Sequence, residues 1–240
     1  MTDRYERQIL IDQIGLDGQK KLSQSSVIVI GAGGLGSPAL TYLAEAGVGR
    51  LGLVDMDTVA SSNLNRQFLH GERDLGRSKA VSAKEKLQAL NSEIEILAYH
   101  ERLTGQNARE RLAGYDLVLG AVDSFETRFD INEACISLGI PYIDGGISGF
   151  SGTVLYSKPP TTPCLNCLFP QKSEHPKIMG VLGTTPGIIG VAMANLALLT
   201  LLGLPNPLLG KLFLYDGLRM QTNLIPVSPS ETCPVCKGGF

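Results

Sequence analysis

The stretch SVIVIGAGGLG, residues 26–36, decides the fold of this chain. Residues 27–30 form an apolar, β-branched run, which is typical of a strand buried on both faces of a sheet. The run leads into Gly31, Gly33 and Gly36, spaced as GxGxxG, and a segment with helical apolar spacing follows. Because such a turn brings backbone N–H groups and a helix N-terminus close to a phosphate, the stretch predicts nucleotide binding.

A second predicted strand, residues 50–54, ends at Asp55, where a carboxylate could hold ribose hydroxyls. The glycine pattern and Asp55 fit NAD, FAD and ATP equally well, so the pattern alone leaves the nucleotide open. A glycine turn needed only for tight strand–helix packing is a further interpretation of the same residues.

Strands and helices continue to alternate along the chain, which predicts an α/β fold with a doubly wound, Rossmann-like parallel sheet. The expected strands lie at 94–98, 116–121 and from 141, and the expected helices at 74–91, 106–112 and 125–138. Ligands in such sheets bind at the carboxyl ends of the strands. The glycine turn, Asp55, Arg66 and Asp123 should therefore meet in one crevice.

Period-two alternation begins near Gly149 and predicts antiparallel strands that extend the edge of the mainly parallel sheet. The apolar stretch 187–204 lies between these strands in the sequence. It has about the minimum length for a membrane span, but Asn195 and Thr200 interrupt it and no basic or aromatic anchors flank it. We therefore expect a helix that is buried on all sides in a core or subunit interface.

The chain has 240 residues and a net charge of −2, with no block of like charge. This composition predicts no nucleic-acid surface and no membrane partner. The charged N-terminus lacks the apolar core of a signal peptide, so we expect a cytoplasmic protein. Without an evident linker, residues 1–240 should form one domain, divided into N-terminal helices (1–25), a nucleotide-binding half (26–147) and a second half (148–240).

Four of the five cysteines form two CxxC pairs, Cys164 with Cys167 and Cys233 with Cys236. Two such pairs predict a tetrahedral four-thiolate zinc site, and four thiolates leave no open position for catalysis. A redox-active CxxC is the alternative for either pair taken alone. The remaining cysteine, Cys135, lies on the apolar face of a predicted helix and is expected to be a core residue.

Taken together, these motifs resemble the MoeB/ThiF/HesA family of adenylyltransferases, which are bacterial relatives of ubiquitin-activating enzymes. The resemblance covers nearly the whole chain. Its motifs are RYERQ at 4–8, GAGGLG at 31–36, DxD at 55–57, NLNRQ at 63–67, GRxK at 76–79, Asp123-Ser124 and the two CxxC pairs.

The resemblance implies that the ligand is ATP with Mg²⁺, and that the substrate is the C-terminal Gly-Gly carboxylate of a small ubiquitin-like sulfur-carrier protein. It implies that Arg66 and Lys79 bind the phosphates, Asp123 holds magnesium and Asp55 holds the ribose. The nucleotide-binding residues implied in this way are Gly31, Gly33, Gly34, Gly36, Asp55, Asp57, Asn63, Arg66, Gln67, Lys79, Asp123 and Ser124.

The family also uses the arginine that matches Arg7, which reaches across a dimer to the partner's nucleotide. A homodimer is therefore expected, with the catalytic set Arg7, Arg66, Lys79 and Asp123. Several relatives carry a further cysteine in the loop that corresponds to residues 171–186, but this chain has none there. This departure places the chain nearest the MoeB branch. Because the sequence ends at Phe240 without a rhodanese-like domain, we expect a separate donor protein to supply sulfur. We expect the loop to be mobile and to cross over the carrier's tail.

Three other functions fit part of the sequence. An NAD- or FAD-dependent oxidoreductase fits the glycine fingerprint, but it gives no role to Arg66, Lys79 or the cysteine pairs. Adenylation of a peptide C-terminus or of a small carboxylate is a further possibility within the family. A non-catalytic zinc-stabilised scaffold is the remaining alternative.

Overall fold

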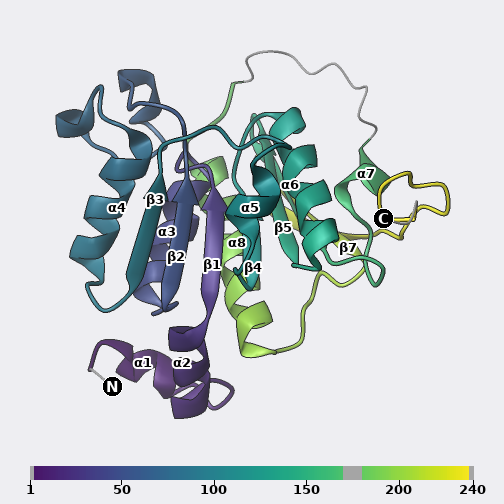
Figure 1. Ribbon diagram of the computed structural model, residues 1–240, viewed down its shortest axis with the longest axis horizontal. Helices are drawn as coiled ribbons and strands as arrows, with labels where there is room; N and C mark the ends of the chain where they lie inside the picture. Colours follow the sequence, from purple (N-terminus) through teal and green to yellow (C-terminus); the bar gives the residue numbers. More distant parts are fainter. Residues whose placement is uncertain (1–2, 170–179, 238–240) are drawn as a thin grey trace.

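The computed structural model describes residues 3–169 and 180–237, which fold around one eight-stranded sheet with the order β3-β2-β1-β4-β5-β6-β7-β8 (Figure 1). The strands are β1 (Ser26–Ile30), β2 (Arg50–Val54), β3 (Glu95–Tyr99), β4 (Leu117–Gly120), β5 (Tyr142–Ser148), β6 (Ser151–Ser157), β7 (Lys211–Asp216) and β8 (Gln221–Pro226). Strands β1 to β5 pair in parallel, and β5 to β8 pair antiparallel. The predicted doubly wound sheet with an antiparallel extension is confirmed.

The helices cover both faces of the sheet. They are α1 (Glu6–Ile9), α2 (Gly15–Gln24), α3 (Gly36–Glu45), α4 (Lys79–Leu90), α5 (Ala108–Leu112), α6 (Phe125–Leu138), α7 (Leu165–Leu168) and α8 (Thr184–Leu202). Short 3₁₀ turns lie at Asp3–Tyr5, Ser61–Asn63 and Glu72–Asp74. The helix expected at 74–91 begins only at Lys79, because Gly76 has φ +77° and Ser78 caps the helix through a hydrogen bond from the Val81 N–H.

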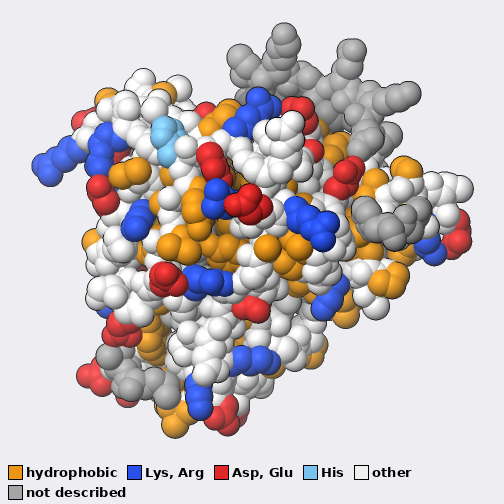
Figure 2. Space-filling view, in the orientation of Figure 1, with side chains coloured by type: hydrophobic (Ala, Val, Ile, Leu, Met, Phe, Trp, Pro, Cys, Tyr) orange, Lys and Arg blue, Asp and Glu red, His pale blue; other side chains and the backbone are white. Residues whose placement is uncertain are grey.

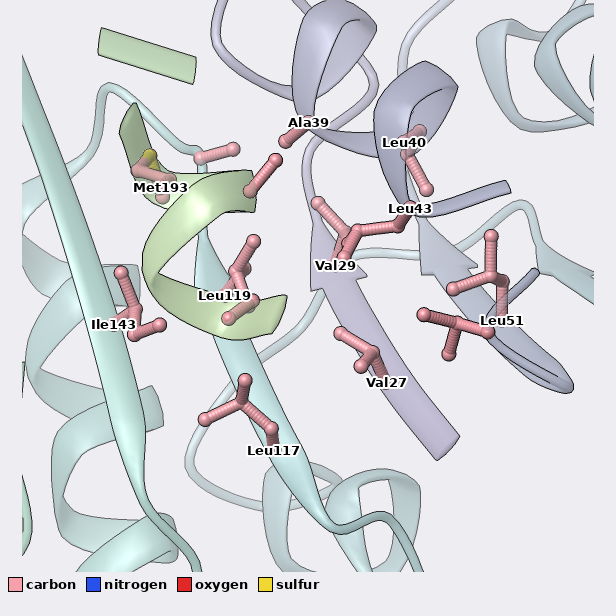
Figure 3. Packing of buried hydrophobic residues seen from close by; sticks show 14 of the residues in the cluster. Val27, Val29, Ala39, Leu40, Leu43, Leu51, Leu117, Leu119, Ile143 and Met193 are labelled. Carbon is pink, nitrogen blue, oxygen red and sulfur yellow. The ribbon is translucent and has the colours of Figure 1, made fainter. Parts of the chain in front are cut away.

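Strand β1 divides its side chains between two cores because successive side chains of a strand point to opposite faces. Val27 and Val29 pack in the larger core with the apolar faces of α3, α4 and α8. Figure 3 shows Leu40 and Leu43 beside Val29, and Met193 of α8 on the side of the core where Ile143 lies. On the other face, β1 packs against α5 and α6. Both faces of the strand are therefore buried, as its apolar run predicts.

Helix α8 is long and apolar enough to cross a membrane, but it packs on α3, β5 and β6 as a core helix, and half of its most apolar 18 residues are buried. Within a single chain the helix is not buried on all sides, since Ile188 and Val191 are 37% and 39% exposed. Burial of that side in a subunit interface stays a prediction. Only one side of the helix faces the sheet. Gly190 allows the close packing, because a Cβ there would lie 2.4 Å from the Leu35 carbonyl oxygen.

Figure 1 shows α1 and α2 at the end of the sheet where β1 begins, opposite the carboxyl ends of the parallel strands. Residues 171–179 of the loop for which we expect mobility lie outside the described residues. Its last part leads into α8 and is tied to Gly149, which accepts the Leu182 N–H at 3.1 Å. On the face seen in Figure 2, Lys and Arg are interspersed with Asp and Glu.

Candidate functional site

The main pocket is an open cavity of about 1090 Å³ at the carboxyl ends of β1, β2, β4 and β5. Most of the predicted site residues line it, as expected for the crevice of a doubly wound sheet. These are Gly31, Gly33, Gly34, Asp55, Asp57, Arg66, Gln67, Lys79, Asp123 and Ser124. The volume exceeds that of a site for one small ligand, so there is room for a nucleotide and part of a second substrate.

The glycine turn joins β1 to α3 and forms one wall of this pocket. Gly31 has φ +100°, and a Cβ there would lie 2.5 Å from the carbonyl oxygen of Ala121. A Cβ on Gly36 would lie 1.9 Å from the carbonyl oxygen of Gly31. Since both obstacles are backbone atoms, only glycine fits at these two positions. Gly36 thus shapes the turn from outside the pocket lining.

Asp55 follows β2 and accepts hydrogen bonds from the backbone of the glycine turn and of its own loop. Its Oδ2 accepts the N–H of Ala32 at 2.8 Å, and its Oδ1 accepts the N–H of Asp57 at 2.8 Å. A carboxylate oxygen has a second lone pair, so both oxygens can still accept from a ligand hydroxyl. Asp55 can therefore orient the turn and bind a ribose at the same time.

Lys79 is the first residue of α4 and is buried, with its Nζ 3.0 Å from Oδ2 of Asp57. The side chain of Asp57 is 55% exposed. A buried ammonium group needs a charge partner, and a half-exposed carboxylate can give up that position to a phosphate oxygen at little cost. The ion pair therefore keeps the Lys79 ammonium group in the pocket that the glycine turn lines.

Arg66 and Gln67 lie in the loop after the Ser61–Asn63 turn. The Nη1 of Arg66 donates to the Ser62 carbonyl oxygen at 2.9 Å and to Oδ1 of Asn65 at 2.7 Å. Gln67 is buried, and its Oε1 has no hydrogen-bond partner among the described residues. An unpaired buried amide oxygen costs about 1–3 kcal/mol, so a ligand donor at this point would be stabilising.

Asp123 and Ser124 follow β4 at the start of α6. The Oγ of Ser124 caps the helix by accepting the Thr127 N–H at 3.4 Å. The carboxylate of Asp123 is exposed to the pocket and forms no ion pair within residues 3–169 and 180–237. An uncompensated carboxylate at a strand end suits a divalent cation.

A buried ion pair beside the same pocket was not predicted from the sequence; Arg128 lines the cavity and Asp144 lies behind it. Arg128 on α6 donates from Nε to Oδ1 of Asp144 at 2.8 Å and from Nη2 to Oδ2 of the same carboxylate. The hydroxyl of Tyr142 also donates to Asp144 at 2.7 Å, and Arg128 lies 4.4 Å from the ring centre of Phe125. Burial alone would lower the pKa of Arg128, but Asp144 raises it above its ordinary value. The pair fixes α6 to β5 beside the pocket.

Two predicted residues lie elsewhere. Arg7 is exposed on α1, at the opposite end of the sheet from the pocket (Figure 1). Asn63 does not line the pocket, and its Oδ1 accepts the Ala60 N–H at 3.1 Å, which closes the 3₁₀ turn before Arg66. The structure therefore does not bring either residue into the site of its own chain.

The four cysteines of the two CxxC pairs meet in one cluster, with all sulfur atoms within 4.8 Å of one another. The Sγ–Sγ distances are 3.7 Å for Cys164 and Cys167, 3.6 Å for Cys164 and Cys233, and 3.5 Å for Cys167 and Cys236. A tetrahedron with Zn–S bonds of about 2.3 Å has edges of about 3.8 Å. The donor set and its spacing therefore fit zinc. Cys135 is buried in the core, as predicted.

The fold and the pocket together define an α/β protein with a nucleotide-type glycine turn, a buried lysine and an exposed carboxylate in one crevice, and a separate four-cysteine cluster. Residues 5–235 match the ThiF family. The chain belongs to that family.

Relatives with assigned names align over almost the whole chain. It is 45% identical to the sulfur carrier protein adenylyltransferase of Thermus thermophilus, over 98% of this chain and 90% of that protein. It is 40% identical to the adenylyltransferase and sulfurtransferase MOCS3-1 of Zea mays, over 98% of this chain but 52% of that protein. The chain thus spans about half the length of the second relative.

Among solved structures, Escherichia coli MccB with ATP matches with a TM-score of 0.86 and 23% sequence identity, over 99% of this chain and 75% of that chain. At this identity the likeness shows the fold alone. It confirms that the sheet order and the helix arrangement described above are those of a known architecture.

Proposed function

We propose that the protein is an adenylyltransferase that transfers the adenylyl group of ATP to the C-terminal Gly-Gly carboxylate of a small ubiquitin-like sulfur-carrier protein. The products are an acyl-adenylate and pyrophosphate. The observation that carries the proposal is the pocket itself, in which the glycine turn, Asp55, Arg66, Lys79 and Asp123 line one cavity. The 45% identity to a sulfur carrier protein adenylyltransferase supports the choice of substrate.

The reaction needs no nucleophile from the protein. A carboxylate oxygen of the carrier forms a bond to the α-phosphorus, the bond from that phosphorus to the bridging oxygen breaks, and pyrophosphate leaves with the electron pair. The protein has to align the two substrates and to neutralise the phosphate charge. Lys79, already buried beside the turn, and Arg66 supply that charge, while Asp55 and Gln67 bind the nucleoside.

The proposal also includes two metal ions, a second copy of the chain and a separate sulfur donor. Asp123 holds Mg²⁺ on the triphosphate, and the cysteine cluster holds a structural Zn²⁺. Arg7 acts in a homodimer on the partner's nucleotide, which agrees with its distance from the pocket of its own chain. A separate donor protein supplies the sulfur that later replaces the adenylate. The cytoplasm remains the predicted compartment.

The test of the activity is ATP–pyrophosphate exchange in the presence of a short protein that ends in Gly-Gly. We expect exchange that depends on Mg²⁺ and on an intact Gly-Gly terminus. Mass spectrometry of the product separates a carrier adenylate from a peptide or small-carboxylate adenylate. Calorimetric binding of NAD in preference to Mg-ATP would instead favour the oxidoreductase, and no exchange with any carrier would favour a scaffold.

Substitution of Asp123 tests the magnesium site. Asp123→Ala should abolish exchange and leave the unfolding transition unchanged, because the carboxylate has no packing role. Glu110→Ala on α5, another exposed acidic residue outside the pocket lining, is the matched control and should keep full activity. Normal exchange in the Asp123 variant would contradict the magnesium role.

Mixed dimers test the role of Arg7. Arg7→Ala and Asp123→Ala subunits should each be inactive alone, and mixing them should restore part of the activity, because some dimers then contain one intact site. Absence of any recovery, with dimers verified by light scattering, would show that Arg7 acts within its own chain or not at all.

A further inference from the structure

The peptide unit of Ala32, in the middle of the glycine turn, is held from both sides. Its N–H donates to Oδ2 of Asp55 at 2.8 Å, and its carbonyl oxygen lies 3.0 Å from Nε2 of His70. Ala32 lies between Gly31 and Gly33, which both line the pocket. The position of these two glycines therefore depends on the two side chains that hold Ala32.

The contacts of His70 define which of its nitrogens carries the proton. A carbonyl oxygen can only accept, so Nε2 bears the hydrogen that is donated to Ala32. The other nitrogen, Nδ1, lies 3.0 Å from the hydroxyl of Ser82 and accepts from it. Ser82 is on α4 and also accepts from Nζ of Lys86 at 3.2 Å. His70 thus bridges the glycine turn and α4.

The surroundings of His70 keep the ring neutral. The side chain is buried, and this burial lowers its pKa. The positive charges of Lys86 and Lys79 also lower the pKa of His70. The hydrogen bond to Ala32 and the negative charge of Asp55 act in the opposite direction and raise the pKa. A neutral ring with one donor and one acceptor matches the two partners on either side.

We propose that His70 is a positioning residue that sets the glycine turn at a fixed distance from α4. This inference rests on the proposed function, because α4 begins with Lys79 and the turn and Lys79 are the two elements assigned to the phosphates. His70 does not line the pocket, so it acts on the nucleotide only through Ala32. The NLNRQ motif identifies Arg66 and Gln67, but it gives no indication of this residue three positions later.

Two amide substitutions separate this role from simple core packing. The side-chain nitrogen of glutamine lies about as far from the backbone as Nε2 of histidine, so His70→Gln can still donate to Ala32. The asparagine amide reaches only the position of Nδ1, so His70→Asn keeps a partner for Ser82 and loses the bond to Ala32. Both variants remove the aromatic ring and leave a neutral amide.

Two measurements are made on the wild type and both variants: the dissociation constant for Mg-ATP by calorimetry, and amide hydrogen exchange of residues 31–36 in the ligand-free protein. We expect His70→Asn to bind Mg-ATP about tenfold more weakly, as for the loss of one net hydrogen bond that fixes the binding conformation. Exchange across the turn should accelerate in this variant. His70→Gln should stay within about twofold of the wild type in both measurements.

Equal behaviour of the two variants would overturn the inference, whether both match the wild type or both lose binding with a lowered melting temperature. The exchange measurement does not require ATP. If the wild type bound no Mg-ATP, the proposed function would fall, while slow exchange in His70→Gln and fast exchange in His70→Asn would still support the positioning role.

Discussion

The buried ion pair between Arg128 and Asp144 yields a graded prediction about stability. The two residues are 5% and 1% exposed, and the carboxylate accepts from two guanidinium nitrogens and from the hydroxyl of Tyr142. Asp144→Ala removes all three acceptor contacts and leaves a cation enclosed in the protein. Removal of one partner from such a pair costs about 3–5 kcal/mol, so we expect a loss of that size in the free energy of unfolding.

Two milder substitutions define the scale. Tyr142→Phe removes one hydroxyl that donates to a charged acceptor and should cost about 1–2 kcal/mol. Asp144→Asn keeps one amide oxygen but loses the charge, so its cost should fall between those of the other two variants. A combined Arg128→Met and Asp144→Leu change removes both charges, and it should recover much of the loss seen in Asp144→Ala.

Urea unfolding followed by circular dichroism gives the free energies, with zinc present throughout so that the cysteine cluster does not vary. The order of losses should be Tyr142→Phe, then Asp144→Asn, then Asp144→Ala. A loss below about 1 kcal/mol for Asp144→Ala would refute the reasoning, since it would mean that Arg128 reaches water when its partner is removed. The reasoning would also be refuted if the double variant had a free energy of unfolding no higher than that of Asp144→Ala.

The other predictions concern the metal, the turn and pH. Cys164→Ala should lower the unfolding free energy by several kcal/mol and remove zinc from elemental analysis, whereas Cys135→Ala should retain the metal; an unchanged melting temperature without zinc in the wild type would contradict this. Gly36→Ala should destabilise by about 1–3 kcal/mol or more because of the contact with a backbone oxygen. Gly187→Ala, where a Cβ meets nothing within 4 Å, should instead stabilise α8 by about 0.5–1 kcal/mol. Because burial holds the pKa of folded His70 below 6.5, the unfolded chain binds a proton first as pH falls, so stability should decrease below pH 6.5 in the wild type more than in His70→Gln.

Short residue patterns along the chain were enough to predict many of the helices and strands. The predicted bounds of helix α6, residues 125–138, match the observed ones, and the structure shows why the helix ends there: Ser124 caps its start and Gly139 closes its end with φ +69°. The path from β1 through the glycine turn to α3 was equally clear, since each step has its own residue pattern. The cysteine cluster could also be predicted without knowledge of the fold, because two CxxC pairs together supply the four thiolates of a tetrahedral zinc site.

Contacts between distant segments could not be predicted in this way. Arg128 and Asp144 are 16 residues apart, and His70 is 38 residues from Ala32, so only the packing of α6 on β5 and of the loop under the turn brings them together. The side of α8 that a single chain leaves exposed could not be identified from the sequence for a similar reason. An apolar composition on all sides predicts burial, but the single sheet face available to this helix covers only part of it.

The cysteine cluster also bears on the entropy of the unfolded chain. Cys164 and Cys233 are separated by 69 residues, and α8, β7 and β8 all lie in the segment between them. A metal bound to both ends turns this segment into a closed loop, and closing a loop of that length in the unfolded chain costs about 4 kcal/mol of entropy. A chelator would thus act on the unfolded ensemble as well as on the native site. With a metal bound, the cluster would constrain the topology of nearly a third of the chain from a place outside the pocket.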